Sequence, residues 1–180
     1  MEKIKRMSLF LKYVFWLILI LIPITDFFGW MYLNGVGDFF IRPEGLGSFY
    51  MAPEIVGIQL SGKMLGFAAS LPLVLLEIFS MWQMIKLFTL YSEGKIFTVD
   101  NINCFSRAAW AFLLSELVSP IVQIGTTYAA TMHNIIGHRV ISVSIDDTNL
   151  GGILLAGVVL AISWVMDEGR KLNEDAELTV

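Results

Sequence analysis

The sequence predicts an all-α integral membrane protein with four transmembrane helices and with both termini in the cytoplasm. Of its 180 residues, 56% are hydrophobic and only 16% are charged, whereas ordinary globular domains carry about a quarter charged residues. The hydrophobic residues gather in four long stretches, each long enough for the roughly 20 apolar residues that cross a bilayer. A soluble fold of this size could not bury so much apolar surface, so lipid must be part of the solvent.

The four predicted spans follow one another in a single domain that covers residues 1–180. The first span, about 7–33, follows a basic start, and no small-residue cleavage site comes after it, so we expect an uncleaved signal anchor. Asp26 in this span is expected near the external interface. The second and third spans, about 60–91 and 103–128, each contain an acid near the middle, and the fourth, about 148–167, has no charge before Asp167.

Lysine and arginine residues predict the orientation of these spans, because cytoplasmic segments carry an excess of both. Nine of them lie on the side of the N-terminus, the connection 92–102 and the tail 168–180, and three (Arg42, Lys63 and Arg139) lie on the other side. Residues 34–59 and 129–147 are therefore expected to be external loops. The stretch RVISVSI at 139–145 alternates like a strand, so we expect small hairpins in these loops.

Small residues recur at four-residue spacing on two of the predicted helices. Gly62, Gly66 and Ser70 form such a stripe in the second span, and Gly152/Ala156 and Gly157/Ala161 form two more in the fourth. Small residues allow helix backbones to approach closely in lipid, where hydrophobicity alone gives helices no attraction for each other. The stripes predict tight packing, either within one chain or across a homodimer.

Two acids form a candidate intramembrane polar site. Glu77 and Glu116 lie near the middle of the second and third spans, where a charged side chain costs about 2.5–3.5 kcal/mol, so both should face the protein interior. Counted from the connection between these spans at ~1.5 Å per residue, the acids reach the same depth, and Glu116 shares its helix face with Ser119 and Gln123. The carboxyls could be protonated and hydrogen-bond the helices together, or could bind a proton, a cation or a small polar ligand.

Patterns typical of enzymes and of metal sites are absent from the sequence, and we expect neither catalysis nor a cofactor. His133 and His138 lie near Asp146 and Asp147, but their spacing matches no tight metal site, so no metal is expected. The single cysteine, Cys104, excludes an intramolecular disulfide. No basic cluster indicates direct contact with nucleic acid.

Residues 92–102, SEGKIFTVDNI, predict a tight cytoplasmic hairpin between the second and third helices. Gly94 supplies the left-handed residue that ends a helix at low steric cost. Thr98 is the expected N-cap of the next helix, with Asp100 in its first turn favouring the positive end of the helix dipole. Phe97 and Ile102 occupy the positions of a hydrophobic staple across this cap.

The hairpin and the acidic tail together carry a family resemblance. The stretch LYSEGKIFTVDNI at 90–102, followed by GRKLNEDAELTV at 169–180, resembles the domain of unknown function 2975 family, small bacterial membrane proteins with four predicted spans. The positions that carry the resemblance are Leu90, Gly94, Phe97, Asn101, Ile102, Leu172, Glu174, Leu178, Thr179 and Val180. The family brings no established activity, and the long first external loop is not typical of it. Its members are often encoded beside a small helix-turn-helix regulator, which implies a cytosolic partner.

These observations favour an uncharacterised, non-enzymatic protein of the bacterial inner membrane with a regulatory or signalling role. Its expected docking residues for a partner are Gly94, Phe97, Asn101, Glu174, Leu178 and Val180. The alternative is a small proton- or cation-coupled transporter, assembled as a homodimer, that uses Glu77 and Glu116.

Overall fold

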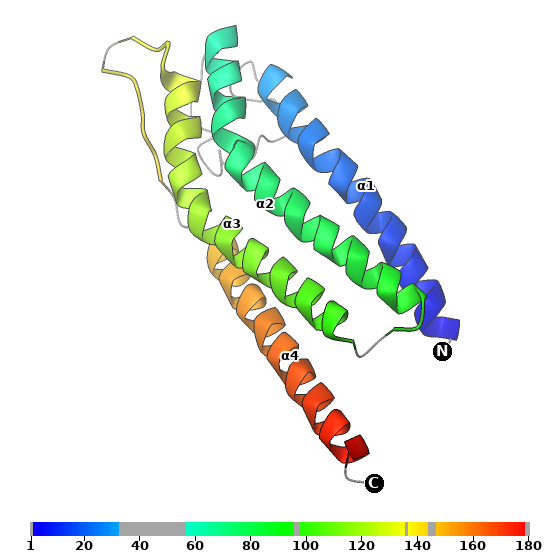
Figure 1. The fold of residues 1–180 in the computed structure, drawn as a ribbon. Coiled ribbons are helices and arrows are strands. Elements are labelled where there is room, and N and C mark those ends of the chain that lie inside the picture. The colour runs from blue at the N-terminus through cyan, green and yellow to red at the C-terminus, as the bar shows by residue number, and fades with distance from the viewer. Residues whose placement is uncertain (1, 33–56, 96–97, 136, 144–146, 179–180) are drawn as a thin grey trace.

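The computed structural model describes residues 2–32, 57–95, 98–135, 137–143 and 147–178, and these ranges contain four helices and no strand. The helices are α1 (Glu2–Tyr32), α2 (Leu60–Ser92), α3 (Val99–Thr131) and α4 (Asp147–Leu178). The all-α class that hydropathy predicts is therefore confirmed. Figure 1 shows that the start of α1, the end of α2, the start of α3 and the end of α4 lie at one end of the molecule, here called the terminal end. The end of α1, the start of α2 and the end of α3 lie at the opposite end, here called the loop end, and α4 begins part-way along α3.

All four helices are long and apolar enough to cross a membrane. Large apolar side chains cover their outer surfaces; Ile121, Leu154 and Val165, for example, are 67%, 71% and 72% exposed. A surface of this kind suits lipid and not water. The protein is therefore a multi-pass membrane protein with four spans.

The helices pack in chain order into a four-helix bundle. α1 packs on α2, α2 packs on α3, and α3 packs on α4, as Figure 1 shows. α2 and α3 thus each have two helical neighbours, whereas α1 and α4 stand at the two ends of this packing order.

The stripe of small residues on α2 lies at its contacts with both neighbouring helices. A Cβ added to Gly66 would overlap the indole ring of Trp30, which α1 contributes and which is completely buried. A Cβ added to Gly62 would lie 2.8 Å from the carbonyl oxygen of Ala129 on α3. The predicted tight packing is present within one chain at this stripe.

The hairpins predicted in the two external loops can be compared with the structure only in part. Residues 34–56 of the first loop lie outside the described residues. In the second loop, the strand expected over 139–145 is absent from its described part, 139–143. This segment instead runs along α3, where Thr131 Oγ1 accepts a hydrogen bond from Val140 N at 3.1 Å and Thr127 Oγ1 accepts one from Ser142 N at 3.2 Å. Threonine hydroxyls of a helix therefore take the place of a partner strand.

The small residues Gly157 and Ala161 of α4 face away from the rest of the chain. Both are exposed, and a Cβ added to Gly157 would meet nothing within 4 Å. The homodimer expected from such a stripe stays a prediction.

The substitution Gly66→Ala should destabilise the fold, because its methyl group would overlap a fully buried ring that has little room to move. We expect a loss of about 1–3 kcal/mol in the free energy of unfolding, the usual cost of overpacking. The matched control is Gly157→Ala, which adds the same methyl group in open space and should leave stability unchanged or raise it by up to about 1 kcal/mol, because alanine is the better helix former. Equal effects in reversible denaturant titrations of the two variants would contradict this packing.

Candidate functional site

Glu116 of the predicted intramembrane site lies against α4. Its Oε2 accepts a hydrogen bond of 2.9 Å from Asn149 Nδ2, and its carboxyl group occupies the space that a side chain at Gly152 would need. The absence of a side chain at Gly152 therefore leaves space for the carboxyl group of Glu116 between α3 and α4. Among the described residues, Asn149 is the hydrogen-bond partner of Glu116, so this carboxyl joins α3 to α4.

The other residues of that predicted site lie on α2 and α3. Glu77 is half-buried on α2, Ser119 is half-buried on α3, and Gln123 is buried and accepts a 2.6 Å hydrogen bond from Thr127 Oγ1 through its backbone carbonyl. Their sharing of one ligand site with Glu116 stays a prediction.

A buried acid lies between α1 and α2. Asp26 was expected near the external interface, and it lies six residues before the end of α1 at Tyr32. Only 1% of it is exposed, and Ser70 Oγ donates a 2.8 Å hydrogen bond to its Oδ2. The hydroxyl of Ser70 therefore has a polar partner in the packed stripe of α2. The position of Asp26 within the first apolar stretch is the sequence signal for a buried acid. The sequence does not indicate its partner, because Ser70 belongs to another helix.

The described residues of the α2–α3 hairpin, at the terminal end, end α2 with backbone hydrogen bonds. Gly94 has φ +84°, Lys95 N donates to Leu90 O at 3.0 Å, and Gly94 N donates to Tyr91 O at 3.0 Å. These two bonds make the Schellman motif that caps α2. The helix end predicted at Gly94 is confirmed.

The start of α3 differs in one detail from the sequence prediction. Thr98 is the N-cap residue and Asp100 lies in the first turn, but the Thr98 hydroxyl makes no capping hydrogen bond. The Thr98 carbonyl instead accepts hydrogen bonds from the backbone N–H groups of Asn101 and Ile102 at 3.1 and 3.3 Å.

Asn101 closes the hairpin from within. Its side chain is fully buried and donates a 2.6 Å hydrogen bond to Lys95 O, so this residue shapes the hairpin and does not present a surface. Of the other expected docking residues, Phe97 and Val180 lie outside the described residues, whereas Glu174 and Leu178 belong to the last turns of α4.

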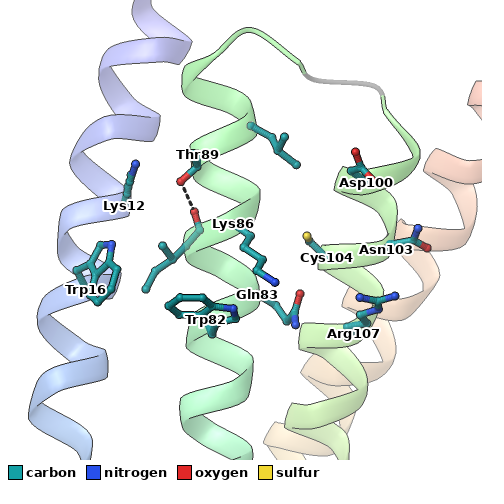
Figure 2. A pocket seen from close by; sticks show the side chains of 12 residues that line it. Lys12, Trp16, Trp82, Gln83, Lys86, Thr89, Asp100, Asn103, Cys104 and Arg107 are labelled. Carbon is teal, nitrogen blue, oxygen red and sulfur yellow. Dashed lines mark hydrogen bonds between the residues drawn. The ribbon is translucent and has the colours of Figure 1, made fainter.

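A cavity of about 560 Å³ lies between α1, α2 and α3 near the terminal end. Its size is within the range of about 300–1,000 Å³ typical of ligand pockets. Figure 2 shows that three helices contribute its polar and aromatic lining, which includes Lys12, Trp16, Trp82, Gln83, Lys86 and Arg107. In the sequence, Lys12, Lys86 and Arg107 indicate only the orientation of the chain, because nothing in their spacing shows that they converge.

Comparison with known proteins identifies a family. The family described as protein of unknown function (DUF2975) has a model that matches residues 50–180. The match includes α2, α3 and α4 with both stretches that carry the resemblance. No curated protein and no solved structure matches the chain.

Proposed function

The chain belongs to the DUF2975 family, and on that premise we propose that it is a non-enzymatic regulatory protein of the bacterial inner membrane. It acts through a docking face at its terminal end, composed of the hairpin around Gly94 and residues 168–178 of α4. The terminal end faces the cytoplasm in this proposal, in line with the nine-to-three distribution of lysine and arginine.

The observation that carries this proposal is the length of α4. The helix continues without interruption to Leu178, well past its charge-free apolar stretch, which ends at Met166. Figure 1 shows its last turns extending beyond the α2–α3 hairpin, away from the other helices. A helix that leaves the bundle in this way offers its sides to a partner.

Charge pairs support the helical form of this extension. Asp167 pairs with Arg170 at 3.2 Å and with Lys171 at 2.9 Å, and opposite charges three and four residues apart favour the helical form. Beyond them, residues 173–180 contain Glu174, Asp175 and Glu177 and no basic residue. The complementary partner has a basic surface.

The small helix-turn-helix regulator suggested by the family resemblance fits this requirement. A protein that binds DNA carries lysine and arginine on the surface that meets the phosphates. An acidic helix at the membrane would bind the same surface and would hold the regulator away from DNA.

Removal of residues 173–180 should weaken capture of the adjacently encoded regulator by about tenfold or more, equivalent to about 1.4 kcal/mol of binding free energy. The measurement is binding of the purified regulator to the full-length protein and to the truncated protein in detergent, at two salt concentrations. Binding should weaken with salt, since exposed charges carry it.

The matched control is Arg139→Gln, which removes a charge from the exposed loop end and should leave binding unchanged. Unchanged capture by the truncated protein would remove α4 from the docking face.

The alternative function, a proton- or cation-coupled transporter, rests on Glu116. An acid inside a helix interface of the membrane is costly unless it has a function or a partner. Here the partner is Asn149. The cavity at the terminal end does not include Glu77 or Glu116 in its lining, which favours a packing role for these acids over a solvated transport site.

We expect Glu116→Gln to change stability by about 1 kcal/mol or less, because a glutamine carbonyl can still accept the hydrogen bond from Asn149. Glu77→Gln is the parallel variant on α2. Proton flux into vesicles containing wild-type protein should equal the flux with either variant. A pH-driven flux in wild-type vesicles that both variants abolish would establish the transporter instead.

A further inference from the structure

We propose that the cavity between α1, α2 and α3 binds the phosphate headgroup of an anionic phospholipid from the leaflet at the terminal end. The inference does not depend on the proposed docking of a regulator. It rests on the charge of the cavity, its depth in the membrane, one buried polar group and its aromatic wall.

The charge of the cavity comes from three different helices. Lys12 on α1, Lys86 on α2 and Arg107 on α3 line it, with Asp100 as the acid. Within the described part of the chain, none of the three cations belongs to an ion pair, and Lys86 Nζ lies 5.6 Å from the ring centroid of Trp82. The lining thus has an excess of positive charge, and an anion in the cavity would relieve the repulsion among the cations.

The depth of these cations matches that of lipid phosphates. Lys86 lies six residues before the end of α2 at Ser92, and Arg107 lies eight residues after the start of α3 at Val99. At ~1.5 Å per residue these positions are about 9 and 12 Å inside the helix ends. A helix of 33 residues is about 50 Å long and exceeds the hydrocarbon core of about 30 Å by roughly 10 Å at each end. The cations therefore lie at the boundary between hydrocarbon and headgroups.

The side-chain oxygen of Gln83 has no hydrogen-bond donor among the described residues. Its side chain lines the cavity, the residue is only 3% exposed, and its Oε1 is buried without a hydrogen bond from any described residue. Figure 2 shows the amide of Gln83 and the ammonium group of Lys86 in the space between α2 and α3. A buried acceptor without a donor costs about 1–3 kcal/mol. A ligand that has a hydroxyl group beside its phosphate, as a glycerol headgroup has, would satisfy both Gln83 and the cations.

The wall of the cavity distinguishes a lipid from a free phosphate. Trp16 and Trp82 meet edge to face with ring centroids 6.0 Å apart, and 38% and 42% of these residues are exposed on the membrane-facing surface. Tryptophan is enriched at the depth where headgroups meet acyl chains. Inorganic phosphate would leave this apolar wall empty, whereas the glycerol backbone and first methylenes of a phospholipid would cover it.

Cys104 provides a reporter that needs no substitution, because it is the single cysteine of the chain and lines the cavity. The experiment measures the alkylation rate of Cys104 by N-ethylmaleimide in purified full-length protein in neutral detergent. Short-chain phosphatidylglycerol at about ten times its dissociation constant should slow the reaction about tenfold, since only the unoccupied fraction reacts. Phosphatidylcholine of the same chain length and inorganic phosphate should slow it by less than twofold.

The variant Lys86→Gln/Arg107→Gln should lose this protection, with rates compared with and without lipid in the same variant. The control Lys3→Gln/Arg6→Gln removes one lysine and one arginine from an exposed part of α1. This variant should keep the protection of Cys104 by phosphatidylglycerol. Native mass spectrometry of the wild-type protein should also show retained phosphatidylglycerol and not phosphatidylcholine. Equal protection by both lipids, protection by inorganic phosphate alone, or full protection in the cavity variant would each overturn the proposal.

Discussion

The close contact of α2 with both of its neighbours is the constraint on which the rest of the structure depends. Gly66 lies under the ring of Trp30, Gly62 lies against the backbone of α3 at Ala129, and Ser70 binds the carboxyl of Asp26. In a bilayer, where apolar surface is equally well solvated by lipid, such van der Waals contacts and interhelical hydrogen bonds drive helix association. All these contacts lie in the half of α2 that is nearer the loop end.

The other half of α2 has large and charged residues where the first half has small ones. Trp82, Gln83 and Lys86 line the cavity there. One helix therefore carries the small-residue contacts near the loop end and one wall of the cavity near the terminal end. The terminal end also has the capped hairpin and the extension of α4, so the groups that could bind a ligand or a partner are concentrated on one side of the membrane.

Hydropathy and helix-capping residues were sufficient to predict the fold, because membrane spans and a Gly94 cap are local features of the chain. Packing of the α2 stripe also followed from its spacing. The partner of Asp26 and the path of residues 139–143 could not be predicted, since each depends on a distant element that supplies a hydroxyl: Ser70 in one case, and Thr127 and Thr131 in the other. The cavity was missed for the same reason, because Lys12 and Arg107 belong to helices that are not consecutive in sequence.

The orientation of the chain tests the central claim most directly, because docking of a cytosolic regulator requires the terminal end to face the cytoplasm. In a Cys104→Ser background, Glu93→Cys would place a thiol on the hairpin and His138→Cys would place one at the loop end; both positions are accessible. With a membrane-impermeant maleimide added to bacterial spheroplasts, we expect labelling at position 138 before lysis and at position 93 only after lysis. Labelling of position 93 in intact spheroplasts, with position 138 protected, would contradict the account.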